Sequence, residues 1–213
     1  MPPVPIPNGG GLRVARYDRK DAYHQRAKRE GYRSRAAYKL IELADKHRLF
    51  AKGDRVVDLG CWPGGWLQVA SERVGPKGRV VGVDLAAMDP PLEIANVIAF
   101  EGDIAEPAVL QRILEELGGP ARWLLSDAAP KLTGVRATDR ARVEALLEAI
   151  EAAIPVLLAP GGGLLVKILE GPEAAAIDKR IRARFAKARA AKSKASRKGT
   201  TERYLLAEGF RGD

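Results

Sequence analysis

A short apolar strand, a glycine turn and an amphipathic helix follow one another at residues 55–74, and no other feature restricts the fold of this chain as much. Residues 55–59 read Arg-Val-Val-Asp-Leu, residues 60–65 read Gly-Cys-Trp-Pro-Gly-Gly, and residues 66–74 carry apolar side chains at helical spacing. In a doubly wound sheet such a turn lies outside the carboxyl end of a strand, where these folds bind ligands. The segment therefore predicts an α/β fold with a ligand site at this turn.

Strand and helix patterns alternate along the rest of the chain. Further strands are predicted at residues 79–84, 97–101, 123–127, 163–169, 185–191 and 203–207, and helices at 107–117, 140–158 and 173–184. This alternation is typical of a mostly parallel, seven-stranded sheet with helices on both faces, and the last two strands favour an antiparallel pair at one edge. Residues 187–198 are too basic for a strand that is buried throughout, so part of them is expected in a loop or at an exposed edge.

One domain with an N-terminal extension is expected from the length of 213 residues. We interpret residues 1–16, whose first part is rich in Pro and Gly, as a flexible leader, and residues 17–213 as a single domain. The extension, at about residues 17–47, is predicted to contain a basic helix up to residue 30 and a second helix that ends near His47. Ser34 is the predicted N-cap of this second helix.

Two kinds of protein are disfavoured by what the sequence lacks. It contains no run of about 18 apolar residues, which disfavours a membrane-spanning helix. Cys61 is the only cysteine, so an intrachain disulfide is impossible. The chain has only two histidines, His24 and His47, so a zinc site is disfavoured as well. We expect a cytoplasmic, monomeric protein without a metal ion and without membrane association.

The net charge of +9 is concentrated in two segments. Residues 13–35 contain nine Lys or Arg and three acidic residues, and residues 179–198 contain ten Lys or Arg and no acidic residue. The remainder of the chain is net acidic, which is the distribution expected of a face that binds a polyanion. Either segment alone would equally suit a solvated charged stretch. Together they favour a nucleic acid as partner.

The glycine turn and two later acidic residues form a candidate nucleoside site. Asp58, Gly60 and Gly64 follow the pattern Asp-x-Gly-x-x-x-Gly, not the Gly-x-Gly-x-x-Gly that binds the pyrophosphate of a dinucleotide. Asp84, at the end of the next predicted strand, is placed to accept hydrogen bonds from ribose hydroxyls, and Asp103, after the third strand, to bind an adenine amino group. S-adenosylmethionine, which has no phosphate, suits this arrangement.

Lys167 and Asp127 are candidate catalytic residues of a methyl transfer. Transfer to a ribose hydroxyl needs a group that takes the hydroxyl proton. Lys167 interrupts an apolar strand, where an unpaired charge is costly, although a lysine there can also reach past the strand end to water. Asp127 ends the fourth strand. Residues 128–130 contain no aromatic ring that could bind a flipped base, which disfavours an enzyme that methylates a base amine. Cys61 lies in the cofactor turn, which disfavours its use as the nucleophile of a carbon methyltransferase.

Several ordered motifs resemble the FtsJ/RrmJ-type ribose 2′-O-methyltransferases, a family that includes the bacterial heat-shock enzyme of large-subunit ribosomal RNA. The motifs are Gly31-Tyr-Arg-Ser-Arg-Ala-Ala-Tyr-Lys-Leu40, Val57-Asp-Leu-Gly-Cys-Trp-Pro-Gly-Gly-Trp66, Val83-Asp-Leu-Ala-Ala-Met-Asp-Pro90, Ser126-Asp-Ala-Ala-Pro130, Leu158-Ala-Pro-Gly-Gly162 and Val166-Lys167. The resemblance covers about residues 21–210. It implies a Rossmann-like methyltransferase fold, S-adenosylmethionine as cofactor, and a uridine of large-subunit ribosomal RNA as substrate.

The resemblance also implies roles for individual residues. The Lys-Asp-Lys-Glu catalytic set of the family corresponds to Lys39, Asp127, Lys167 and Glu202. Lys167 would receive or direct the hydroxyl proton, Asp127 and Lys39 would orient it and balance charge, and Glu202 would be auxiliary. Together with the residues of the glycine turn, the predicted cofactor contacts are Asp58, Gly60, Gly64, Trp66, Asp84, Asp103 and Asp127.

Two positions depart from the family pattern. Cys61-Trp62 replaces the small pair that usually precedes Pro-Gly-Gly-Trp, so the Trp62 indole must point away from the methionine moiety or reshape its pocket. Lys131 stands where the ribosomal enzymes carry Asn, which bears on the RNA target more than on the reaction. A transfer RNA methyltransferase therefore remains an alternative. An RNA-binding protein without activity is disfavoured by the four catalytic matches, and a nicotinamide oxidoreductase by the glycine pattern.

Overall fold

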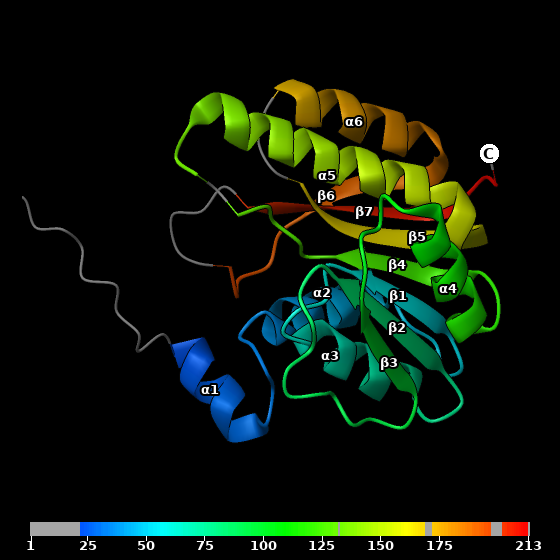
Figure 1. Ribbon diagram of the computed structural model, residues 1–213. Coiled ribbons are helices and arrows are strands. Elements are labelled where there is room, and N and C mark those ends of the chain that lie inside the picture. The colour runs from blue at the N-terminus through cyan, green and yellow to red at the C-terminus, as the bar shows by residue number, and fades with distance from the viewer. Residues whose placement is uncertain (1–21, 132, 169–171, 197–201, 213) are drawn as a thin grey trace, which may run out of the picture.

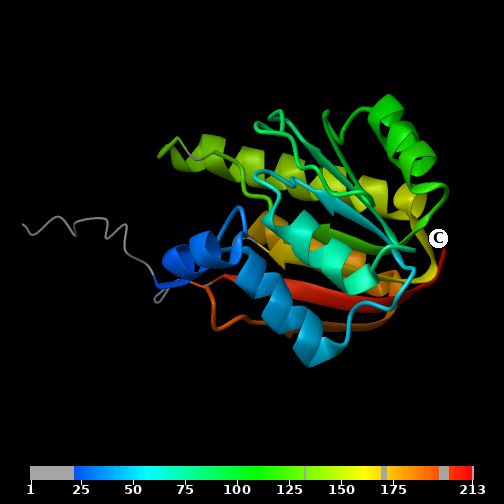
Figure 2. The same cartoon turned by 90° about the horizontal axis from the view of Figure 1, so that it is seen from below.

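A computed structural model describes residues 22–131, 133–168, 172–196 and 202–212. They form three layers, with one sheet between two layers of helices (Figures 1 and 2). The predicted leader at residues 1–16 and the start of the first predicted helix lie outside the described residues. The Rossmann-like arrangement that the alternating pattern predicts is confirmed.

The sheet has seven strands in the order β3-β2-β1-β4-β5-β7-β6. The strands are β1 Arg55–Leu59, β2 Arg79–Asp84, β3 Val97–Glu101, β4 Ala121–Ser126, β5 Leu158–Ile168, β6 Phe185–Ala191 and β7 Arg203–Phe210. Strands β1 to β5 pair in parallel, and β7 is antiparallel to both of its neighbours, β5 and β6. The predicted antiparallel pair at one edge is thus confirmed, with β6 outermost.

Helices cover both faces because the central strands are apolar on both sides. Every residue of β1 after Arg55 is buried, as expected of a parallel strand between two helical layers. Helices α2 and α3 pack on one face, and α4, α5 and α6 on the other (Figure 1). The helices are α1 Ala22–Glu30, α2 Ala37–His47, α3 Gly65–Val74, α4 Pro107–Leu117, α5 Arg136–Leu157 and α6 Pro172–Ala183. None of the helices in the described part of the chain combines the length and the apolar character that a membrane span requires.

The prediction that Ser34 caps the second helix is wrong. Helix α2 begins at Ala37, and its N-cap residue Ala36 makes no side-chain capping bond. The Ser34 carbonyl accepts a hydrogen bond from the Ala37 N–H in a turn that precedes the helix. The Ser34 hydroxyl packs against the start of α3, where a Cβ added to Gly65 would come within 2.4 Å of it. The contact of Ser34 with the start of α3 thus determines the position of this serine.

Two elements begin four or five residues earlier than predicted, and β4 begins two residues earlier, at Ala121. Helix α5 starts at Arg136 instead of residue 140, after a loop in which the Asp139 carboxylate accepts hydrogen bonds from the Thr133 and Gly134 N–H groups. Strand β5 starts at Leu158 instead of residue 163, because it pairs with β4 before the register shifts at a bulge. Both extensions depend on contacts that a local sequence pattern does not contain.

The basic segment near the C-terminus forms an exposed edge, as its charge predicts. In β6 only the end residues Phe185 and Ala191 are buried, whereas Lys187 and Arg189 are exposed. The chain then leaves the sheet as a loop over residues 192–196. Residues 197–201 lie outside the described residues.

Candidate active site

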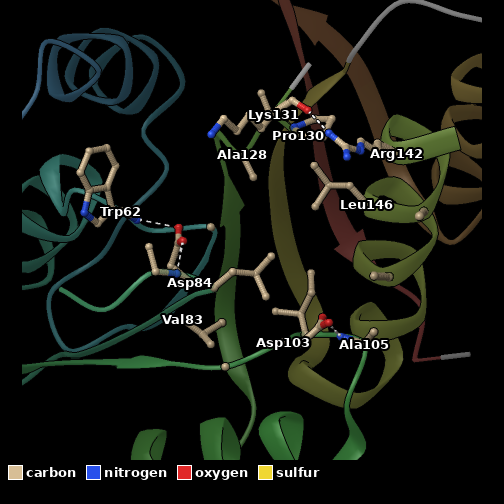
Figure 3. Close-up of a pocket in the computed structure, with 18 of the residues that line it drawn as sticks. Trp62, Val83, Asp84, Asp103, Ala105, Ala128, Pro130, Lys131, Arg142 and Leu146 are labelled. Atoms are coloured by element: carbon tan, nitrogen blue, oxygen red, sulfur yellow. Dashed lines mark hydrogen bonds between the residues drawn. The ribbon is translucent and has the colours of Figure 1, made fainter. Parts of the chain in front are cut away.

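A cavity of about 680 Å³ opens at the carboxyl ends of β1, β2 and β4, with α5 as its opposite wall (Figure 3). This volume is in the range of cofactor sites. The glycine turn after β1 contributes Gly60, whose φ is +78°. A Cβ at this position would come within 2.4 Å of the Ala128 Cβ, so only glycine lets the turn approach the loop after β4 so closely.

Asp84 and Asp103 line the cavity, as their positions at strand ends predict. The Asp84 carboxylate accepts hydrogen bonds of 2.9 Å from the backbone N–H groups of Trp62 and Ala86. The Asp103 carboxylate accepts one of 2.9 Å from the Ala105 N–H. Because each carboxylate oxygen has two lone pairs, both side chains retain acceptor capacity for a ligand.

The chemistry of the lining suits S-adenosylmethionine. Asp84, Asp103 and Asp127 bring three carboxylates to one cavity, next to apolar side chains such as Val83 and Ile104. The carboxylates suit a positively charged sulfonium and the hydroxyl and amino groups of a nucleoside, and the apolar side chains suit an adenine ring. The residues present therefore fit the cofactor.

Three predicted cofactor contacts lie outside the cavity wall. Gly64 is the N-cap of α3, with a φ of +103°. Trp66 is buried, with its indole N–H donating to the Ala36 carbonyl at 2.9 Å and its ring beside Tyr204. Asp58 is buried within β1. Contact of these three residues with the cofactor stays a prediction.

Asp58 is a buried acid without a hydrogen-bond partner. Neither of its carboxylate oxygens has one among the described residues. Burial, together with the negative charges of Asp127 and Asp84, raises the pKa of Asp58 well above its ordinary value. We therefore expect Asp58 to be neutral in the cofactor-free protein.

The four residues of the predicted catalytic set come together from four segments. Lys39 lies on α2, Asp127 follows β4, Lys167 lies on β5 and Glu202 precedes β7. Asp127 forms ion pairs with both ammonium groups: Lys39 Nζ lies 3.3 Å from Oδ2 and Lys167 Nζ lies 3.2 Å from Oδ1. Lys39 Nζ also lies 2.8 Å from Glu202 Oε1. Because Asp127 is part of the cavity wall, this cluster adjoins the cofactor site.

Tyr204 joins the cluster, although the sequence analysis did not single it out. It is fully buried in β7 and pairs with Lys167 in the β5–β7 register. Its hydroxyl donates to Asp127 Oδ1 at 2.8 Å and lies 3.2 Å from Glu202 Oε1. Burial and the charges of these carboxylates raise the Tyr204 pKa, so the hydroxyl stays a donor. The available signal was its spacing of two residues from Glu202, which places both side chains on one face of an extended segment.

Glu202 is held in its ionised form by its neighbours. The Ser196 hydroxyl donates to Glu202 Oε1 at 2.7 Å. Burial acts to raise the Glu202 pKa, but hydrogen bonds from Lys39 and Ser196 outweigh it and hold the pKa below its ordinary value. Glu202 and Asp127 thus balance the charges of the two ammonium groups.

Comparison with known proteins assigns the chain to a family. The family described as FtsJ-like methyltransferase matches residues 32–210. The chain belongs to this family. Curated relatives of this FtsJ-like methyltransferase are described as ribosomal RNA large subunit methyltransferase E. The relative from Methanothermobacter thermautotrophicus is 43% identical over 195 residues, which are 91% of this chain and 92% of the relative. The relative from Rhodopseudomonas palustris is 41% identical over 217 residues, which cover 98% and 90%.

Solved structures support the same fold. A Plasmodium falciparum chain described as a ribosomal RNA methyltransferase has a TM-score of 0.72 and 31% identity, and the match covers 85% of the FtsJ-like methyltransferase and 100% of that chain. Fibrillarin from Aeropyrum pernix, solved with bound S-adenosyl-L-methionine, has a TM-score of 0.56 and 18% identity, with 80% and 75% covered. This second likeness concerns the fold alone.

Replacing Asp84 by Ala should weaken S-adenosylmethionine binding, because the carboxylate lines the cavity and retains acceptor capacity. We expect a loss of about 2 to 3 kcal/mol, the range for hydrogen bonds to a charged group. Calorimetric titration measures this loss, and Glu93→Ala, which removes an exposed acid of the following loop, is the control. Unchanged affinity in a folded Asp84→Ala variant would refute the placement of the cofactor.

Asp58→Asn should stabilise the cofactor-free protein at neutral pH. The pKa of Asp58 is higher in the folded state than in the unfolded state. Its contribution to the free energy of unfolding is therefore fully present below the unfolded-state pKa and is lost as the pH rises through the folded-state pKa. Asn keeps the shape of the neutral acid and does not titrate. The melting temperature should rise by about 2 to 4 °C per kcal/mol recovered near pH 7, and by less near pH 4. An equal effect at both pH values would contradict a raised pKa.

Proposed function

We propose that this chain transfers the methyl group of S-adenosylmethionine to a ribose 2′-hydroxyl of RNA, with a uridine of large-subunit ribosomal RNA as its substrate. The observation that carries the proposal is the cluster of Lys39, Asp127, Lys167 and Glu202 beside a cavity that fits the cofactor. The side chains of this cluster are only 10% to 19% exposed. A protein that only binds RNA has no use for two ammonium groups held on one carboxylate at this place.

The cluster has the groups that transfer to a hydroxyl requires. When bound, S-adenosylmethionine supplies a methyl group that its positive sulfur activates. The acceptor hydroxyl must be oriented for in-line attack and must lose its proton. Lys167 Nζ is held by a hydrogen bond to the main-chain carbonyl of Asp127 and by an ion pair with its carboxylate. We assign Lys167 as the group that receives or directs this proton.

Lys39 and the carboxylates complete the arrangement. Lys39 is held between Asp127 and Glu202, so its ammonium group cannot turn away from the cluster without leaving both carboxylates. Fixed positive charges stabilise the negative charge that develops on an attacking oxygen. Tyr204 positions Asp127 through its hydroxyl and acts on the acceptor only through that residue.

Basic residues reach the same end of the sheet. In the register of β6, β7 and β5, Ala191, Tyr204 and Lys167 lie in one row. The exposed Lys192 and Lys194 follow Ala191 directly, so this basic stretch starts at the level of the catalytic lysine. A strand that bears positive charge along the edge beside the active site is suited to the backbone of RNA.

The segment 192–196 is anchored to the N-terminal helices. Glu42 on α2 accepts hydrogen bonds of 2.7 Å from the Ser193 hydroxyl and the Lys194 N–H, and Arg35 donates to the Ala195 carbonyl at 2.6 Å. Figures 1 and 2 both show α1 near the segment that follows β6. The second basic segment begins on α6, which packs in the opposite helical layer, so its residues on α6 do not belong to this surface. We define the basic face as Lys28, Arg29, Lys187, Arg189, Lys192 and Lys194.

The choice of ribosomal RNA rests on the shared description of the relatives, which favours it over transfer RNA. We propose that the protein acts in the cytoplasm, where ribosomal RNA lies in a bacterial or archaeal cell, and that it acts as a monomer. Methylation assays with large ribosomal subunits, free ribosomal RNA and transfer RNA from cells that lack the protein would decide between the substrates.

Lys167→Ala should abolish methylation and leave cofactor binding nearly intact, because Lys167 acts on the acceptor hydroxyl. We expect the rate of methyl transfer to fall by about 10² to 10⁴, the contribution of a general base. Incorporation of labelled methyl groups into RNA measures the rate, and Lys77→Ala, which removes an exposed lysine before β2 and outside the basic face, is the control for loss of a charge. A Lys167→Ala rate within tenfold of wild type would show that the assignment is wrong.

Neutralising Lys28, Arg29, Lys187 and Arg189 together should weaken RNA binding and flatten its salt dependence. Phosphate contacts release counterions, so each lost contact should lower the slope of log affinity against log salt by about 0.7 to 0.9. Binding to a ribosomal RNA transcript is measured at several salt concentrations. The matched control neutralises four exposed cations before or at the starts of β1 and β2: Lys52, Arg55, Lys77 and Arg79. Equal slopes for both quadruple variants would mean that the basic face does not bind RNA.

A further inference from the structure

Trp62 is a large aromatic side chain exposed at the rim of the cofactor cavity. It is 56% exposed, whereas tryptophan is highly buried in most proteins. Its backbone N–H donates to Asp84 at the cavity wall, and its ring points away from the cavity interior (Figure 3). None of the steps of methyl transfer described above uses this ring. An exposed ring with two flat faces next to a ligand cavity is suited to stacking.

Basic side chains near Trp62 favour a polyanion as the molecule whose ring stacks on the indole. Gly64 lies against Arg33, because a Cβ on this glycine would be 3.3 Å from the Arg33 Cδ. Lys131, which is exposed, lines the same cavity on another side, and Arg142 of α5 donates to the Lys131 carbonyl (Figure 3). The Asp84 carboxylate accepts hydrogen bonds from the backbone N–H groups of Trp62 and Ala86. Two cations, Lys131 and Arg142, therefore line the cavity that Trp62 borders, together with the carboxylates of Asp84, Asp103 and Asp127.

We propose that the Trp62 indole stacks on an unpaired nucleobase of the RNA substrate, at or beside the nucleotide that is methylated. This inference rests on the proposed function, because it deepens the same site by naming a contact to RNA. Trp62 is among the residues that line the cavity, but its ring points away from the cavity interior (Figure 3), which favours RNA over the cofactor as the partner of the ring. A base that stacks on an indole must leave its own helix, so the surface selects single-stranded or flipped-out nucleotides.

The energetic role of such a contact differs from that of the basic face. Stacking uses the π-face that every base has, so it is tolerant of sequence and involves no counterion release. Phosphate contacts by lysine and arginine make binding depend on salt. Loss of Trp62 should therefore lower the affinity for RNA and leave the salt slope unchanged.

Intrinsic fluorescence gives a direct reading of the proposed contact. The chain has three tryptophans, and Trp66 and Trp123 are only 4% and 3% exposed. Titration with a single-stranded oligoribonucleotide should quench the emission of Trp62, and S-adenosylmethionine alone should quench it much less. In Trp62→Phe this quenching should disappear while the protein still binds RNA.

Affinity measurements on matched variants complete the test. Trp62→Ala should raise the Kd for the single-stranded probe by about 5- to 150-fold, the range for alanine in place of a stacking aromatic, and Trp62→Phe by much less. The Kd for S-adenosylmethionine and the salt slope should stay at wild-type values. Lys131→Ala serves as the contrast that changes the salt slope, and Val156→Ala, an exposed apolar residue at the end of α5, as the control for lost apolar surface.

The outcomes separate this inference from the proposed function. Weaker RNA binding and lost quenching in Trp62→Ala, with cofactor affinity kept, support stacking. Weaker cofactor binding with unchanged RNA affinity would show instead that the indole covers the cofactor, and would overturn the inference. Wild-type RNA affinity and quenching in a variant that lacks Trp62 would also overturn it. Failure of the wild-type protein to methylate any RNA would count against the proposed function, whatever Trp62 does.

Discussion

The active site depends on the carboxylate of Asp127, which forms ion pairs with two ammonium groups at once. Lys39 and Lys167 come from a helix and a strand that are far apart in sequence, and each would repel the other without the acid between them. Removing one partner of a buried pair leaves an uncompensated charge, which costs about 3 to 5 kcal/mol. Asp127 thus links α2 and β5 through their two lysines. The bulge in the β4–β5 pairing precedes the paired stretch that places Lys167 beside Asp127.

Asp127 also lies where two regions of opposite charge meet. The cavity at the ends of β1 and β2 is lined by acids, which suits a cationic cofactor. The edge strand β6 and the loop after it carry exposed lysines, which suit RNA. Asp127 belongs to the cavity wall and to the lysine cluster, so in the proposed function the methyl donor and the acceptor would meet beside this residue. The segregation of charge would then orient both substrates before any specific contact forms.

Local patterns predicted most of the fold correctly. The strands β1, β2, β3 and β6 have the predicted bounds. In β1, β2 and β3 an apolar run between turn residues is itself the signal of a strand, and in β6 Lys187 and Arg189 alternate with alanines, which is typical of an exposed edge strand. The errors have a common cause. Ser34 packs against α3 instead of capping α2, and β5 gains five residues by pairing with β4. Both depend on neighbours that are remote in sequence.

The sequence by itself determined which chemistry is present, since the glycine turn, the acids at the strand ends and the motif around Lys167 can all be identified one segment at a time. Only the tertiary structure decided which of these residues meet. It brings Tyr204 into the cluster through the β5–β7 register and joins the two basic segments through the hydrogen bond from Arg35 to the Ala195 carbonyl. It also buries Trp66 while leaving Trp62 exposed, although both lie in one motif. The physical reason is that a motif specifies residue types and spacing, whereas burial and pairing depend on the elements that pack around them.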